Sequence, residues 1–210
     1  MGSKYCPVPI NALLRHVLSS DNKFAITSIP CQMIGLRKAE EVVDGLAEKI
    51  SLHIGLFCNH MLNFYGVLLI LHKLGIKPDD VASLTYRSKG WPGGLTVRLK
   101  GGDEVFCDLH SYMALWNPFI FTPLACTICP DGTNELADIS LGDAQYLPEI
   151  TGSGYSTIIV RTSLGEELLN SAVEAGLVEI TKIGMNNLIW NKRGILRFKK
   201  RAILARMRLL

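Results

Sequence analysis

The chain has 210 residues, of which 48% are hydrophobic and 20% charged, and its formal net charge is +3. This balance is typical of a folded protein with one good core and argues against a disordered chain. The N-terminus lacks the apolar run of a secretory signal and no apolar run is long enough to span a membrane, so we expect a cytoplasmic protein without disulfides.

Hydrophobic periodicity divides the first part of the chain into alternating helices and strands. A lead at 1–9 contains two prolines that oppose helix formation. After it the predicted elements are a helix at 10–18, a strand at 24–29, a helix at 32–49 interrupted near Gly35, a strand at 51–57, a helix at 61–74 and a strand at 81–87.

Turn residues and β-branched runs organise the rest of the chain. Asp108 is placed to cap a helix, and Ser163 with Glu166 has the spacing of a capping box. The predicted elements are a turn at 90–94, a hairpin of strands at 95–99 and 105–107, a helix at 108–116, strands at 137–141 and 155–161, a helix at 163–175, a strand at 177–182 and a helix at 186–210 bent at Gly194.

This alternation predicts an α/β fold with a mixed, partly parallel sheet and flanking helices. We expect one domain at 1–182 and a basic amphipathic helix at 183–210. No acidic residue follows Glu179, and the segment beyond it contains Lys182, Lys192, Arg193, Arg197, Lys199, Lys200, Arg201, Arg206 and Arg208. Such a segment suits an acidic partner surface or peripheral contact with a membrane, and we expect no binding of nucleic acid.

The strongest chemical signal is the C-x-x-C of Cys126 and Cys129, which Pro130 and a turn at Asp131-Gly132 follow. This spacing lets two thiolates from one loop reach a single metal centre. Redox dithiols and zinc knuckles use the same spacing, so the motif alone leaves the choice open.

Two further cysteines, Cys31 and Cys58, each stand just after an apolar strand. Turns of this kind gather at the carboxyl edge of an α/β sheet, so both thiols converge if the two strands are neighbours. The C-x-x-C loop could then complete a set of four thiolates, which suits either an iron–sulfur cluster or zinc. We interpret Cys6 and Cys107 as small buried hydrophobic residues.

Several stretches occur together in a characteristic order. They are SIPCQMIGLRK at 28–38, GLFC at 55–58, YRSKGWPG at 86–93, the C-x-x-C-x-D at 126–131 with ADISLGD at 137–143, and GYS at 154–156 with VRT at 160–162. In order and spacing they resemble the coenzyme F-420 hydrogenase/dehydrogenase beta-subunit family, which includes 7-hydroxymethyl chlorophyll a reductase.

The resemblance implies an oxidoreductase subunit with one 4Fe–4S cluster and an FAD. It would pass electrons between a deazaflavin- or ferredoxin-type carrier and a redox partner protein or small acceptor. The implied cluster ligands are Cys31, Cys58, Cys126 and Cys129. The implied flavin contacts, or residues close to them, are Arg87, Lys89, Trp91, Gly93, Asp138, Gly142, Asp143, Ser156 and Arg161.

A function of a different class stays open, namely a non-catalytic α/β module that a metal staples and that docks a larger partner. Members of the resembled family usually have further residues upstream, with a Gly/Ser-rich segment that contributes to the flavin site. We therefore expect this chain to form an incomplete flavin site by itself.

Overall fold

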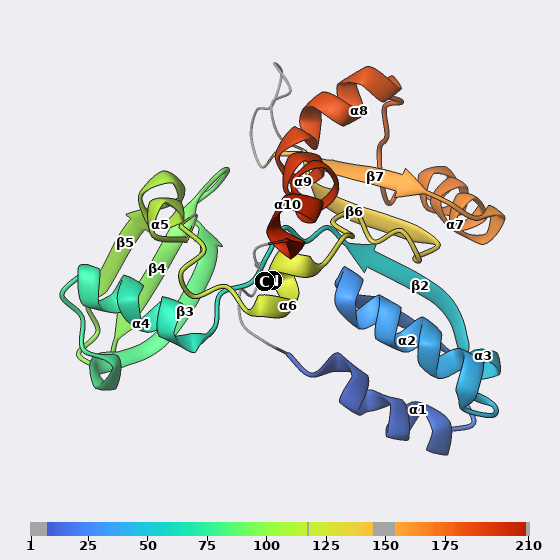
Figure 1. Cartoon of the computed structure of the whole chain (residues 1–210), viewed down its shortest axis with the longest axis horizontal. Coiled ribbons are helices and arrows are strands. Elements are labelled where there is room, and N and C mark those ends of the chain that lie inside the picture. The colour runs from blue at the N-terminus through green and yellow to red at the C-terminus, as the bar shows by residue number, and fades with distance from the viewer. Residues whose placement is uncertain (1–7, 117, 145–153, 209–210) are drawn as a thin grey trace. The chain divides into compact units, whose positions relative to one another are not determined.

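The chain forms two structural units, each of which contains one β-sheet (Figure 1). The computed structural model describes residues 8–116, 118–144 and 154–208. The described part of the first unit consists of Val8, residues 60–116 and 118–127, and Gly154; the second unit contains residues 9–59, 128–144 and 155–208. Residues 183–208 belong to the second unit, and the predicted division at 182 stays a prediction.

The second unit has a four-stranded sheet with the strand order β1-β2-β6-β7. The first three of these strands run parallel, and β7 pairs antiparallel with β6, which confirms the predicted mixed, partly parallel sheet. Parallel pairing brings the turns that follow β1 and β2 to the same edge. The strands are β1 (Phe24–Ser28), β2 (Ile50–Leu56), β6 (Ile139–Asp143) and β7 (Ser156–Val160).

Helices at the start of the second unit pack around a core in which Met33, Leu36 and Leu46 are almost completely buried. The predicted interruption near Gly35 is wrong, because the first long helix continues through Gly35 and the chain turns at Gly45, whose φ is +77°. A left-handed residue at that turn suits glycine. The elements are η1 (Ile10–Leu13), α1 (Leu14–Ser19), α2 (Pro30–Val42) and α3 (Leu46–Lys49).

A helix cap differs from the predicted one after β7. The helix α7 (Ser163–Glu174) has Thr162 as its N-cap, and the Thr162 hydroxyl accepts a hydrogen bond from Gly165 N at 3.2 Å. Ser163 is therefore already the first helical residue. Thr162 takes the cap because its backbone is extended (φ −127°, ψ 159°), as a cap residue requires.

The C-terminal region folds onto the second unit in short pieces. The predicted strand at 177–182 is wrong: the residues from 178 to 184 have no regular structure, and Val178 and Ile180 remain about 40% exposed. No strand within the described ranges pairs with this segment. Without a paired neighbour, an extended conformation of its alternating sequence is not stabilised by hydrogen bonds or by packing against a sheet. A single helix was expected at 186–210. The described residues instead form four short elements: α8 (Met185–Asn191), α9 (Arg193–Leu196), the π-turn η3 (Arg197–Arg201) and α10 (Ile203–Met207).

The first unit has a three-stranded antiparallel sheet with the order β3-β4-β5, which confirms the predicted hairpin. Its core includes Ile70, Leu95, Val97 and Tyr112. Asp108 Oδ1 accepts a hydrogen bond from Ser111 N at 3.0 Å, so the predicted cap is confirmed. The elements are α4 (Phe64–Lys73), η2 (Pro78–Asp80), β3 (Val81–Ser88), β4 (Gly94–Leu99), β5 (Glu104–Asp108) and α5 (Leu109–Trp116). The helix α6 (Leu124–Ile128) follows, and its last residue already belongs to the second unit.

None of the helices in the described parts of the chain is long and apolar enough to cross a membrane. The peripheral membrane contact predicted for the basic segment stays a prediction.

Candidate functional site

Two of the four candidate cysteines lie at the carboxyl edge of the second unit's sheet. Cys31 is the second residue of α2, directly after β1, and Cys58 follows the end of β2 by two residues. Since β1 and β2 are parallel neighbours, with Ser28 opposite Gly55, both turns reach the same edge. Cys31 is exposed and Cys58 partly buried. A thiolate near the N-terminus of a helix is favoured by the helix dipole, which suits Cys31 to a ligand's role.

The loop that follows Cys129 lies across the ends of these strands. Gly132 O accepts a hydrogen bond from Cys58 N at 2.9 Å. Asn134, which is completely buried, donates from Nδ2 to Ser28 O at 2.7 Å. These two bonds attach the loop to the turn after β2 and to the end of β1. Three cysteine-bearing segments, those of Cys31, Cys58 and Cys129, thus meet at one edge.

Asp131 organises this loop from inside. Its Oδ1 accepts hydrogen bonds from the backbone N–H groups of Thr133 (3.0 Å) and Asn134 (2.8 Å), and its Oδ2 accepts one from Glu135 N (2.8 Å). The residue is 5% exposed, so these backbone donors replace the water that burial removes. Neither Asp131 nor Asn134 was among the predicted site residues, although the Asp-Gly-Thr-Asn sequence is typical of a side-chain-stabilised turn.

Arg161, a predicted flavin contact, also supports the loop. Its guanidinium donates to Ser140 Oγ at 2.5 Å and to Thr133 O at 3.0 Å. Burial lowers the pKa of Arg161, and the negative charges of Asp131 and Glu135 counter part of that effect. The guanidinium therefore joins β6 and β7 to the cysteine loop.

Cys126 lies within α6 and belongs to the first unit, so the division between the units falls inside the C-x-x-C. In the described ranges 8–116, 118–144 and 154–208, no three His, Cys, Asp or Glu side chains lie together in an arrangement that could hold a metal ion. The set of four ligands remains a prediction that rests on the three segments that do meet and on the spacing of Cys126 from Cys129.

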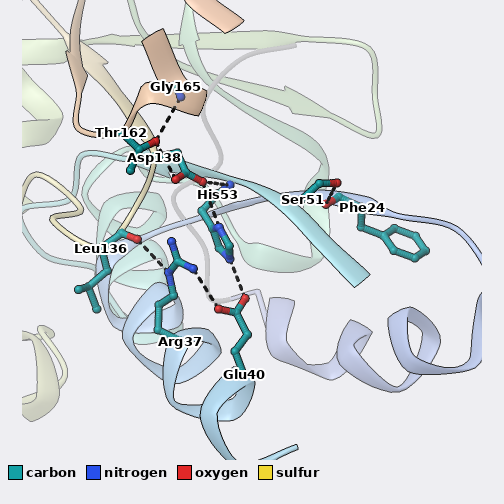
Figure 2. A network of polar contacts seen from close by, with 9 residues as sticks. All are labelled: Phe24, Arg37, Glu40, Ser51, His53, Leu136, Asp138, Thr162 and Gly165. Atoms are coloured by element: carbon teal, nitrogen blue, oxygen red, sulfur yellow. Dashed lines mark hydrogen bonds and ion pairs between the residues drawn. The ribbon is translucent and has the colours of Figure 1, made fainter. Parts of the chain in front are cut away.

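A buried ion network in the second unit joins α2, β2 and Asp138, the residue before β6 (Figure 2). His53 on β2 contacts a carboxylate with each ring nitrogen: Nε2 is 2.6 Å from Glu40 Oε1, and Nδ1 is 3.1 Å from Asp138 Oδ2. Asp138 Oδ2 also accepts from His53 N at 2.8 Å, and its Oδ1 accepts from the Thr162 hydroxyl at 2.9 Å. On α2, Arg37 donates to Glu40 Oε2 and to Leu136 O, both at 3.1 Å.

The geometry of this network limits where its protons can lie. Carboxylates only accept hydrogen bonds, so a ring with one on each side is either an imidazolium that donates twice or has a protonated carboxyl beside it. An imidazolium together with Arg37 balances the charges of Glu40 and Asp138. Burial would raise the pKa of Asp138, but the hydrogen bonds from His53 N, Thr162 and the His53 ring outweigh it and lower that pKa. No pattern in the sequence indicated a functional role for His53.

The network joins all three cysteine-bearing segments. Glu40 and Arg37 belong to the helix that begins at Cys31, and His53 belongs to the strand that leads to Cys58. Asp138 stands just after the loop that Cys129 begins. The ion network therefore holds α2, β2 and the end of the cysteine loop together close to the residues that carry the cysteines.

Four predicted flavin contacts lie at the end of β3, which contains Arg87, and in the turn that leads from it to β4 in the first unit. Arg87 and Lys89 are left-handed (φ 60° and 61°), which is uncommon for residues other than glycine. The Arg87 guanidinium carbon lies 4.7 Å from the centre of the Trp91 ring. A Cβ on Gly93 would stand 2.4 Å from Ser88 O, so the turn admits only glycine there. Outliers of this kind gather at functional sites, where the surrounding structure maintains them.

Lys89 has a partner within its own unit. Its Nζ lies 3.0 Å from Glu104 Oε1 and 5.0 Å from the centre of the Phe106 ring. The bond from Lys89 lowers the pKa of Glu104. A carboxylate of the same sheet therefore already compensates the charge of this lysine.

The remaining predicted contacts lie on β6 and β7. Asp143 and Ser156 are opposite each other in the antiparallel pair, and Ser156 is exposed. Gly142 faces Phe57, where a Cβ would stand 2.3 Å from the ring. Close packing against Phe57 explains the glycine, whatever its relation to a flavin.

Replacing Gly142 by Ala is expected to destabilise the protein by about 1–3 kcal/mol, because the added methyl group overpacks the contact with Phe57. Urea unfolding measures the change. Gly194→Ala is the matched control, since a Cβ there meets nothing within 4 Å and alanine favours the helix. Equal stability of Gly142→Ala and the wild type would contradict the packing explanation.

Comparisons with known proteins place these observations in one family. A family model matches residues 21–185, and its description is the C terminus of the beta subunit of coenzyme F420 hydrogenase/dehydrogenase. The chain is 31% identical over 195 residues to a coenzyme F420 hydrogenase subunit beta of Methanothermobacter thermautotrophicus, covering 87% of this chain and 61% of that protein. It is 31% identical over 201 residues to a coenzyme F420-dependent sulfite reductase of Methanocaldococcus jannaschii, covering 86% of this chain and 29% of that protein.

A solved structure shares the fold. A chain from the F420-reducing NiFe hydrogenase complex of Methanosarcina barkeri superimposes with a TM-score of 0.66 at 22% identity, covering 98% of this chain and 69% of that chain. In the sequence comparison, the chain spans about three fifths of the length of the beta subunit from Methanothermobacter thermautotrophicus. Because the family model matches more than half of its residues, the chain belongs to the family of coenzyme F420 hydrogenase/dehydrogenase beta subunits, in the part described as their C terminus.

Proposed function

We propose that the chain is part of an oxidoreductase subunit that passes electrons through one 4Fe–4S cluster and an FAD. The electrons would pass between a deazaflavin- or ferredoxin-type carrier and a redox partner protein or a small acceptor. The observation that carries this proposal is the meeting of the Cys31, Cys58 and Cys129 segments at one edge of the sheet. The names of the relatives, a coenzyme F420 hydrogenase subunit and a coenzyme F420-dependent sulfite reductase, support the same class of reaction.

The segments at this edge supply thiols, the ligand type that an iron–sulfur cluster requires. Cys31, Cys58 and Cys129 reach it from the second unit, and Cys126 stands three residues before Cys129. Among the described residues, buried polar atoms without a hydrogen-bond partner include Ser28 Oγ, Asn59 Oδ1 and Asn134 Oδ1, all on these segments. Partnerless buried polar atoms are rare, and they are expected where a further group binds. A flavin accepts a hydride and releases single electrons, which a cluster can take up one at a time.

For the flavin, the first unit offers the turn of Arg87, Trp91 and Gly93. The guanidinium suits a phosphate oxygen, because it is always charged and donates several hydrogen bonds in one plane. Lys89 contributes less, since Glu104 already pairs with it. In the second unit, Asp138, Gly142 and Arg161 have the structural contacts described above, so we assign them to the support of the site.

Metal analysis after anaerobic purification tests the proposal. We expect about four irons and four sulfides per chain, as a cubane cluster requires, with a brown colour and flavin absorbance if FAD is held. Zinc without iron would favour the alternative, a structural module stapled by the cysteines. A chain that takes up neither metal under reconstitution would contradict both.

Cys58→Ser is expected to lose most of the bound iron, because a hydroxyl is a poor replacement for a thiolate ligand. Cys107→Ser is the control, because Cys107 lies on β5 of the first unit and is outside the ligand set. Burial raises the pKa of its thiol, with the Asp108 charge adding to the effect, which disfavours the thiolate. Iron content and visible absorbance of both variants decide the matter. A Cys58→Ser variant with full iron and colour would remove Cys58 from the ligand set.

A further inference from the structure

Two lysines of the C-terminal region are buried in the second unit, where lysine is rarely found. Lys192 is 4% exposed and Lys199 is 2% exposed. Neighbouring Asn191 is completely buried and accepts a hydrogen bond at Oδ1 from the Thr157 hydroxyl at 3.1 Å. The helices from α8 to η3 therefore pack on the sheet, and the side chains of Lys192 and Lys199 are buried within the second unit. Residues beyond 185 lie outside the match to the family model.

Lys192 reaches Phe57, the residue that precedes Cys58. Its ammonium donates a hydrogen bond to Asp143 O and lies 4.9 Å from the centre of the Phe57 ring. Phe57 in turn donates from its backbone N–H to Leu141 O at 2.7 Å, next to Cys58 in the chain. The charge of Lys192 thus stands over the residue that immediately precedes a candidate ligand.

The side chain of Lys199 packs along the cysteine loop at Gly132, and its ammonium lies 5.3 Å from the centre of the Phe198 ring. Measured from the point where a Cβ on Gly132 would stand, Lys199 Cγ is 3.0 Å away and Cys58 O is 3.5 Å away. The neighbouring Lys200 pairs with Glu135 at 2.6 Å, which attaches this part of the helix to the same loop. Both buried lysines consequently pack against segments that carry candidate ligands.

A buried ammonium is costly unless negative charge compensates it. Burial lowers the pKa of Lys192 to about 8, and the charge of Asp143 offsets only part of that effect. For Lys192, an anion at the cysteine edge would supply the rest of the compensation. A cluster held by four thiolates is such an anion, and reduction by one electron makes it more negative.

We propose that Lys192 and Lys199 form a cationic wall of the cysteine site and raise the reduction potential of the cluster bound there. This inference rests on the proposed function. Because positive charge favours the more negative, reduced form, the two lysines make the cluster a better one-electron acceptor. The C-terminal segment is then a tuning element of the site.

A redox titration tests this inference on the intact chain. Anaerobically purified wild type, Lys192→Met and Lys199→Met are reduced stepwise with dithionite, and the reduced cluster is measured by electron paramagnetic resonance. Each Met variant is expected to show at least a tenfold lower ratio of reduced to oxidised cluster at a fixed potential, which is a shift of about 59 mV for one electron. Lys192→Arg keeps the charge and should keep the wild-type ratio.

Lys200→Met is the matched control, because Lys200 is an exposed member of a surface ion pair on the same helix, and its ratio should change less than twofold. Wild-type potentials in both Met variants, with four irons each, would overturn the inference and leave the proposed function intact. A wild type without iron would overturn both. If Lys199→Met loses its cluster, Lys199→Arg must restore it, and failure to do so overturns the role of charge at that position.

Discussion

Replacing Asp138 by Ala is expected to lower the free energy of unfolding by about 3–5 kcal/mol, the usual cost of removing one partner from a buried ion pair. The substitution leaves His53 N, the His53 ring and the Thr162 hydroxyl without the carboxylate that accepts from them. It also leaves Glu40 as the remaining carboxylate partner of the His53 ring. Urea unfolding of the metal-free chain, followed by circular dichroism, measures the change.

Glu41→Ala provides the control for this prediction, because Glu41 is an exposed carboxylate next to Glu40 on the same helix. It should change stability by less than about 0.5 kcal/mol, as surface substitutions usually do. A loss below about 1 kcal/mol in Asp138→Ala would show that the network does not hold the second unit together.

The pH dependence of stability gives a second test of the same network through the titration of Asp138. Its pKa is lower in the folded chain than in the unfolded one, so the folded state binds fewer protons. The contribution of the carboxylate is therefore complete above about pH 4, the ordinary pKa of Asp, and is lost as the pH falls through the lower folded value. The stability gap between wild type and Asp138→Asn should shrink over that acidic range.

Local patterns in the sequence were sufficient for the framework of the site. The apolar runs that end before Cys31 and Cys58 predicted two strands, and these strands are parallel neighbours. The residues that follow them therefore reach one edge, as the general geometry of α/β sheets requires. Such patterns work where a segment's burial decides its structure, as it does for β1 and β2.

The ion network could not be predicted in the same way. The carboxylate partners of His53 stand 13 and 85 residues away along the chain, so no local spacing reveals them. A single histidine in an apolar strand is read as an ordinary core residue. The strand predicted at 177–182 failed for the opposite reason, since its alternation is local but no sheet edge in the described part of the chain pairs with it.

Replacing Asp131 by Ala is expected to release the cysteine loop, because three backbone N–H groups lose their acceptor at once. Hydrogen bonds to a charged group contribute about 1.5–3 kcal/mol each, so the loop should lose several kcal/mol of local stability. Hydrogen exchange of the metal-free chain measures this directly: the amides of Thr133, Asn134 and Glu135 should exchange at least roughly 100-fold faster.

Asp131→Asn separates the geometry of the loop from its charge. The Asn side chain keeps one acceptor oxygen, so Thr133 and Asn134 should retain most of their protection while Glu135 loses its own. Unchanged protection of all three amides in Asp131→Ala would mean that Asn134 and its bond to Ser28 hold the loop without the carboxylate. Release of the loop together with lower iron uptake on reconstitution would instead identify Asp131 as the residue that presents Cys129 at the edge of the sheet.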